Sequence, residues 1–158
     1  MLTTIAQVLA VIAVLGNGIV YGTDVCAALV TRSVNRHLSD AELTKFAGWG
    51  HYYADKRMPF AGVSGVVATA LTILVAALAG AGAAAGAGGV ALVALVTWLG
   101  LYARVAKPVN NAQKAAAQAG TTPADARALQ QKWESILASR VGLQVLAVAA
   151  LCAALALL

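Results

Sequence analysis

Four long apolar stretches divide the chain, at about residues 2–30, 58–79, 90–106 and 141–158. A run of about 17 to 25 mostly apolar residues is long enough to cross the roughly 30 Å of hydrocarbon in a bilayer as an α-helix. The pattern therefore predicts an all-α, polytopic membrane protein. We expect a bundle of four transmembrane helices that forms a single membrane domain over residues 1–158.

The first connection, residues 31–57, is polar and aromatic. Ser39 and Glu42 have the spacing of a capping box, which marks the start of a helix. Apolar side chains then recur on a loosely helical face, at Leu43, Phe46, Trp49 and Tyr53. Together these features predict a short helix after the first span that lies in the membrane interface, with its aromatic rings at headgroup depth.

The other connections are predicted from glycine and proline. Residues 80–89 contain only Gly and Ala, so we expect a hairpin between the second and third spans. Pro108 restricts the residue before it and is expected to interrupt the helix that leaves the third span. Thr122 has the position of an N-cap before Pro123, and the helix begun there is predicted to continue unbroken to Leu158. The fourth span is then the end of a long helix that extends into the cytoplasm.

The charged residues indicate the orientation. Only 11% of the residues are charged and 61% are hydrophobic, which is too few charges to cover a soluble surface of this size. Every Lys and Arg lies between Arg32 and Arg57 or between Arg104 and Arg140. The positive-inside rule then predicts a multi-pass protein of the plasma membrane with cytoplasmic loops at 31–57 and 107–140 and both termini outside. The net charge of +5 indicates contact with anionic membrane lipids and not with nucleic acid.

Small residues predict close helix packing. They form two rows in the second span, namely Ala61, Gly65, Thr69 and Ala68, Thr72, Ala76. Such rows let two helix backbones approach each other within a membrane. They fit a helix of the same chain and a helix of a partner equally well, so the pattern does not decide between the two.

Two charged side chains are predicted to pair inside the bundle. Asn17, Tyr21 and Asp24 fall on one stripe of the first span, and Arg140 opens the fourth span at a similar depth. A lone charge at the centre of a membrane helix costs about 2.5 to 3.5 kcal/mol, and less near the interface. A pair between Asp24 and Arg140 is therefore the expected arrangement.

Further polar and aromatic residues are expected at the same mouth of the bundle. These candidate binding residues are Asn17, Tyr21, Tyr102, Asn110, Asn111 and Trp133. Each also has a structural interpretation: Arg140 can extend to lipid phosphates, Trp133 can be an ordinary interfacial aromatic residue, and Asn17 can join two helices by a hydrogen bond.

His51 is a candidate proton carrier, because a free imidazole titrates at about pH 6.5. His37 is the only other histidine, and neither has Cys or paired carboxylates at ligand spacing. We therefore expect no metal. We also expect no cofactor, because the Gly-rich tract lies between spans and does not have the pattern of a phosphate-binding loop.

The last third of the chain resembles the anthrone-oxygenase-like family of small four-span membrane proteins, most of them of unknown function. The similarity rests on Pro108-Val-Asn-Asn111, Trp133 and Arg140 directly before the final span. Weaker matches are Gly18-Ile-Val-Tyr-Gly22 and Arg57-Met-Pro59. Leu137 departs from the pattern, since many members carry a polar residue such as His there.

The resemblance implies oxidation of a lipid-soluble aromatic or quinone-like molecule by O₂ without a dedicated cofactor. It assigns the base to Asp24 or His51, and the stabilisation of an oxyanion to Arg140 with its neighbours. Two alternatives stay open. In the first, the chain is a non-catalytic accessory or assembly subunit, either as a homo-oligomer or with a partner membrane protein. In the second, it forms an oligomeric transporter or channel.

Overall fold

A computed structural model describes all 158 residues, and every element in it is helical. The first rod consists of α1 (Leu2–Cys26), the π-helical turn η1 (Ala27–Thr31) and α2 (Arg32–Asn35). The second rod is the single helix α3 (Asp40–Leu78). The third consists of α4 (Gly82–Leu101), the π-helical turn η2 (Tyr102–Ala106) and α5 (Lys107–Ala119). The fourth consists of α6 (Ala126–Glu134) and α7 (Leu137–Ala156).

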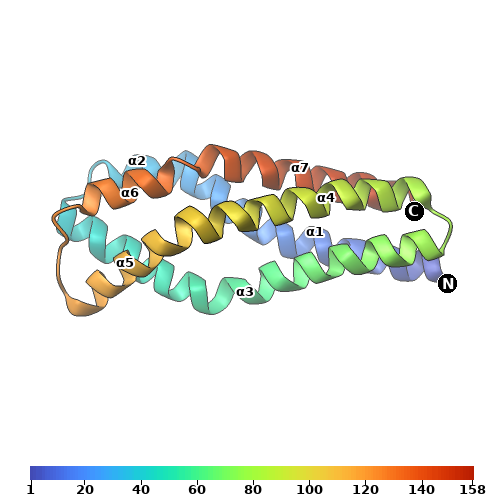
Figure 1. Cartoon of the computed structure of the whole chain (residues 1–158), viewed down its shortest axis with the longest axis horizontal. Helices are drawn as coiled ribbons and strands as arrows, with labels where there is room; N and C mark the ends of the chain where they lie inside the picture. Colours follow the sequence, from blue (N-terminus) through green and yellow to red (C-terminus); the bar gives the residue numbers. More distant parts are fainter.

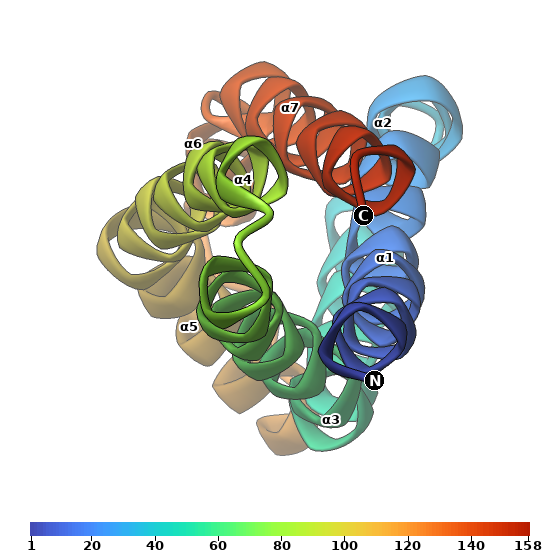
Figure 2. The ribbon, with the colours of Figure 1, turned by 90° about the vertical axis from the view of Figure 1, so that its right-hand side faces the viewer.

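The four rods lie lengthwise beside one another (Figure 1). Seen from the end that holds both termini, α1, α3, α4 and α7 form a ring in which each helix has two neighbours (Figure 2). The turn between α3 and α4 lies at the same end as the termini. All four rods are long and apolar enough to cross a membrane, which confirms the predicted number of spans.

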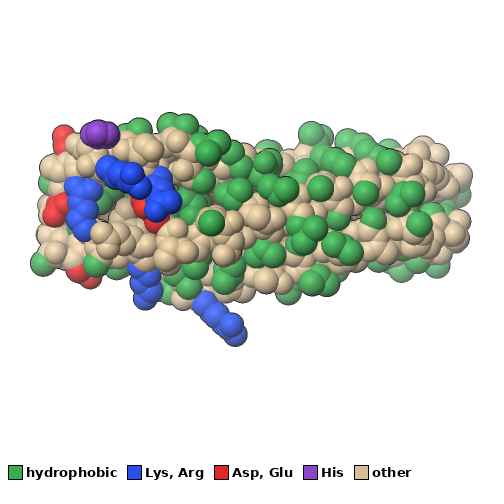
Figure 3. Space-filling view, turned by 90° about the horizontal axis from the view of Figure 1, so that it is seen from above, with side chains coloured by type: hydrophobic (Ala, Val, Ile, Leu, Met, Phe, Trp, Pro, Cys, Tyr) green, Lys and Arg blue, Asp and Glu red, His purple; other side chains and the backbone are tan.

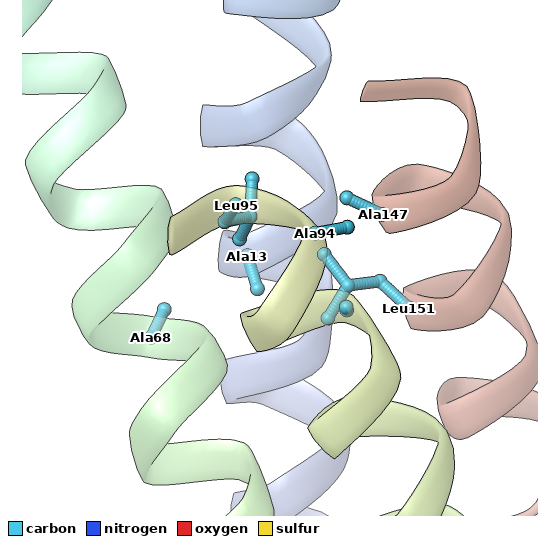
Figure 4. Packing of buried hydrophobic residues seen from close by; sticks show 7 residues of the cluster. Ala13, Ala68, Ala94, Leu95, Ala147 and Leu151 are labelled. Carbon is cyan, nitrogen blue, oxygen red and sulfur yellow. The ribbon is translucent and has the colours of Figure 1, made fainter. Parts of the chain in front are cut away.

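Alanine dominates the core of the bundle. Its main cluster contains only two leucines among seven buried residues, namely Ala13, Ala68, Ala91, Ala94, Leu95, Ala147 and Leu151 (Figure 4). These side chains come from all four rods. Because most of them are no larger than a methyl group, the helix backbones lie close together around them.

The backbones of α1 and α3 approach each other closely. A Cβ added to Gly16 would lie 2.8 Å from the carbonyl oxygen of Ala61, and one added to Gly65 would lie 2.9 Å from the backbone nitrogen of Asn17. Only glycine fits at either position without a shift of the backbone. The two predicted small-residue rows of α3 contribute to packing within this chain. Their buried members are Gly65, Thr69, Ala68, Thr72 and Ala76.

The separate short helix predicted within residues 31–57 is absent as a distinct element. The capping box of Ser39 and Glu42 is present and starts α3 as predicted. The helix then runs without a break past Pro59 to Leu78. Proline is tolerated within membrane helices, because neighbouring groups and local adjustments compensate for the lost hydrogen bond.

The expected break at Pro108 is also absent. The rod continues from α4 into α5 through η2, where the N–H of Lys107 donates to the carbonyl oxygen of Tyr102, five residues earlier. Pro108 then occupies the first turn of α5, where a missing N–H is tolerated. Gly120 ends α5 with a φ of +66°, as predicted for a C-cap.

Two other boundaries differ from the predictions. The Gly/Ala hairpin is only a tight turn at Gly80, with a φ of +76°, because α4 begins at Gly82. The last rod is not one helix from Thr122. Asp125 occupies the N-cap position of α6 without a side-chain capping hydrogen bond, and a turn at Ser135 and Ile136 separates α6 from α7. The backbone of Ile136, at φ −100° and ψ 0°, interrupts the regular helix there.

Candidate functional site

The predicted pair between Asp24 and Arg140 is present, and it joins α1 to α7. Nη2 of Arg140 donates to Oδ1 of Asp24 at 2.6 Å. Both residues are buried, with 2% of Asp24 and 6% of Arg140 exposed. Nε1 of Trp98 on α4 donates to the other carboxylate oxygen at 2.9 Å. Asp24 therefore accepts one hydrogen bond on each oxygen, from two different helices.

Arg140 lies between two indole rings. Its guanidinium carbon is 5.1 Å from the ring centre of Trp98 and 5.0 Å from that of Trp133. A cation over an aromatic face is stabilised by the ring's quadrupole, and more strongly when both are removed from water. Asp24 and the two rings together hold the guanidinium in one position.

Several buried polar atoms around Arg140 have no hydrogen-bond partner. The donors are Nε and Nη1 of Arg140 and Nε1 of Trp133. The acceptors are Oδ1 of Asn110 and Oε1 of Gln144. An unpaired buried polar group costs about 1 to 3 kcal/mol, so such groups are rare unless something else binds them.

These residues line a cavity of about 910 Å³. All four rods contribute to its wall, and most of the wall outside the Asp24–Arg140 region is formed by apolar side chains such as Val20, Met58 and Leu95. A space of this size is at the upper end of ordinary small-molecule sites. It combines a largely apolar surface with polar side chains, at Asp24 and Arg140 and also at Arg32, Asp55 and Glu134.

His51 lies on the first half of α3, before the apolar segment 58–79, and its ring centre is 5.7 Å from that of Trp133. The pKa of His51 is lowered to about 4, mainly by burial; Asp55 and a hydrogen bond with Gln113 oppose this shift, and the positive charges of Arg140 and Lys114 add to it. His51 is therefore neutral at pH 7. This pKa lies below that of a free imidazole, and the role of His51 as a proton carrier stays a prediction.

A second polar group borders the cavity where α3, η2 and α5 meet. The carboxylate of Asp55 accepts from Tyr102 Oη at 3.3 Å and forms an ion pair with Lys114. Tyr102 stacks on Trp98 with ring centres 5.7 Å apart. Because Trp98 also contacts Asp24 and Arg140, the two polar groups are connected through aromatic rings.

The structure brings most of the predicted site residues together. Those that line the cavity are Asn17, Asp24, His51, Tyr102, Asn110, Trp133 and Arg140. Tyr21 and Asn111 do not line it: Tyr21 is half-buried elsewhere on α1, and Asn111 is exposed. Asn17 also matches its structural interpretation, since its Nδ2 donates to the carbonyl oxygen of Ala13 at 2.8 Å and weakly to Thr69 Oγ1 at 3.4 Å.

Sequence reasoning missed Trp98 and Asp55 as members of the site. The signal for Trp98 was its indole N–H inside an apolar span, since a buried indole needs an acceptor and Asp24 is the carboxylate within the first span. Asp55 gave a weaker signal, because it lies in a polar segment where a solvated charge is ordinary. Neither position follows from helical spacing alone.

No three His, Cys, Asp or Glu side chains converge in a way that would hold a metal ion. No family model, no curated protein and no solved structure matches this chain. The site must therefore be interpreted from its own geometry.

Proposed function

We propose that this cavity binds a flat, oxygen-bearing aromatic or quinone-like molecule that dissolves in the membrane, and that the protein oxidises such a molecule with O₂. The observation that carries the proposal is the group of three unpaired donors on Arg140 and Trp133 within a mostly apolar cavity. A carbonyl or phenolate oxygen would satisfy these donors. The apolar wall would contact the rings of the same molecule.

The fixed guanidinium favours a developing negative charge over a neutral group. Asp24 occupies Nη2 and leaves Nε and Nη1 free, so the ligand oxygen would meet a positive charge that is already oriented. Preorganised donors of this kind stabilise an oxyanion without reorganisation during the reaction. An anthrone has such an oxygen, because loss of a proton from its central CH₂ moves negative charge onto the oxygen of its carbonyl group.

The proposed reaction converts that CH₂ into a ketone. A base removes one C–H proton, and the resulting anion gives its electron pair to O₂ to form a C–O bond and a peroxide. The peroxide takes up a proton, and loss of the second C–H proton then breaks the O–O bond. One oxygen atom remains as the new carbonyl and the other leaves as water, so one O₂ is consumed for each quinone formed.

His51 is the better placed base in this proposal. Both oxygens of Asp24 are already occupied by donors, so Asp24 is assigned to positioning Arg140 and Trp98. His51 is neutral and can accept a proton, although its low pKa makes it a weak base. An anion bound beside it would raise that pKa, because a nearby negative charge favours the protonated imidazole.

The proposal includes an orientation in the plasma membrane. The Lys and Arg side chains gather toward the end of the bundle that carries α2, α5 and α6, and apolar side chains are spread over the remaining surface (Figure 3). The positive-inside rule assigns that end to the cytoplasm and both termini to the outside. The first part of α3 then extends from the interface together with α5 and α6.

The reaction is tested with purified protein in lipid nanodiscs supplied with anthrone and air. We expect anthraquinone absorbance to rise in step with O₂ uptake. Trp133→Phe keeps an aromatic ring but removes the Nε1–H donor, and loss of one such donor is expected to lower the rate by about tenfold or more. Trp49→Phe is the matched control, because Trp49 does not line the cavity.

Two results would count against the proposal. One is a rate equal to that of nanodiscs without protein. The other is an equal loss of rate in Trp133→Phe and Trp49→Phe, since that would show that the indole donor in the cavity has no specific part.

A further inference from the structure

The cavity does not end inside the bundle. Three of its lining residues, Val63 and Val67 on α3 and Leu99 on α4, are 62%, 52% and 42% exposed. A side chain that both lines a cavity and is largely exposed lies at an opening of that cavity. Along this flank of α3 the cavity therefore reaches the outer surface of the bundle.

One opening of the cavity, between α3 and α4, is apolar. The lining residues on this side are Pro59, Val63, Val66 and Val67 of α3 with Leu95 and Leu99 of α4. They belong to the apolar parts of two helices that are long enough to span a membrane. This flank faces hydrocarbon if the chain spans the bilayer as proposed, and a polar molecule would gain nothing by entering there.

The polar end and the apolar opening belong to one continuous space. Trp98, which donates to Asp24, and Leu99, at the opening, line the same cavity. The same cavity thus has fixed hydrogen-bond donors at its inner end and an apolar slot at the surface of the bundle.

We infer that the ligand is an amphiphile: an oxygen-bearing aromatic head bound at Arg140 and Trp133, with an alkyl or isoprenoid tail that passes between α3 and α4 into the bilayer. This inference rests on the proposed function and narrows its substrate class. The tail adds little binding energy, because lipid chains are as apolar as the slot. Because the cavity opens between α3 and α4, the site accepts an aromatic molecule that carries a tail, which a closed cavity would exclude.

The test uses two probes, anthraquinone and the same ring with a decyl chain that carries a diazirine. Binding of each to the protein in nanodiscs is measured by quenching of tryptophan fluorescence. The tailed probe is then activated by light, and the adducts are mapped by mass spectrometry. We expect both probes to bind with affinities within about tenfold of each other, corresponding to less than 1.4 kcal/mol. Adducts should concentrate on residues 59–67 and 95–99 and disappear when excess anthraquinone is added.

A variant narrows the slot without changing the donors. Val63→Trp is expected to weaken binding of the tailed probe about tenfold more than it weakens binding of anthraquinone. Val93→Trp is the control, because Val93 is 68% exposed on the same helix as Leu99 but does not line the cavity.

The outcomes separate the two proposals. Binding of anthraquinone without binding of the tailed probe would overturn the slot and leave the proposed function standing. The slot would also be overturned if the adducts were spread over all lipid-facing helices and did not decrease when excess anthraquinone is added. If neither probe binds, the proposed function fails and the slot fails with it.

Discussion

Arg140 and Asp24 are 116 positions apart in the chain, yet the Arg140 guanidinium donates to the Asp24 carboxylate at 2.6 Å. We expect Asp24→Leu to destabilise the protein by about 3 to 5 kcal/mol, because it leaves a buried charge without its partner. The double variant Asp24→Leu with Arg140→Leu should lose less than the sum of the two single variants. Unfolding in detergent by increasing denaturant measures each free energy, and strict additivity would show that the pair is not coupled.

Trp98 and Trp133 both contact Arg140, but their indole nitrogens have different partners. Trp98→Phe removes the hydrogen bond to Asp24 and should cost about 1.5 to 3 kcal/mol of stability, since the acceptor is charged. Trp133→Phe removes a donor that has no hydrogen-bond partner within the protein, so it should not lower stability. Thermal unfolding of the two variants beside Trp49→Phe checks this order. The opposite order would mean that the donor of Trp133 is satisfied within the protein.

The contact between Gly16 and Gly65 predicts a strong response to a single methyl group. Gly65→Ala would place a Cβ 2.9 Å from the backbone of Asn17, and such overpacking costs about 1 to 3 kcal/mol. Gly18→Ala is the matched control, because a Cβ there meets nothing within 4 Å. Since Ala favours the helix over Gly by about 1 kcal/mol, the control should be neutral or slightly more stable in the same denaturation assay.

His51 should make the stability of the protein depend on pH in the acid range. Its pKa is about 4 in the folded protein and about 6.5 in an unfolded chain, so the unfolded state binds the proton first as the pH falls. Stability is then lost between about pH 6.5 and pH 4, by up to about 3 kcal/mol. His51→Gln should remove this part of the pH dependence. Unfolding curves of both proteins at pH 7 and pH 5 measure how much free energy of unfolding each loses between these pH values. An equal loss in the two proteins would contradict the prediction.

The proposed orientation predicts which parts of the chain an antibody can reach. Epitopes fused to the N- and C-termini should be accessible on intact cells. An epitope inserted after Gly120, in the turn between α5 and α6, should become accessible only after the membrane is permeabilised. If only the epitope after Gly120 were accessible on intact cells, the charged end would lie outside and the proposed topology would be wrong.

The sequence by itself determined the four apolar rods, because the length of an apolar run is a local property that hydrocarbon selects directly. It also determined the pair of Asp24 with Arg140, because two charges at similar depth in a bilayer have few other partners. The capping box at Ser39 and the C-cap at Gly120 were equally local.

Only the tertiary structure decided where the helices continue and which side chains share the cavity. Pro59 and Pro108 do not end their rods, because the surrounding helices and a π-helical turn accommodate them. Tyr21 lies on the predicted stripe but does not line the cavity, whereas Trp98 contacts Asp24. The physical reason is that helical spacing fixes which residues share a face, while packing contacts such as that of Gly16 with Gly65 fix where that face points.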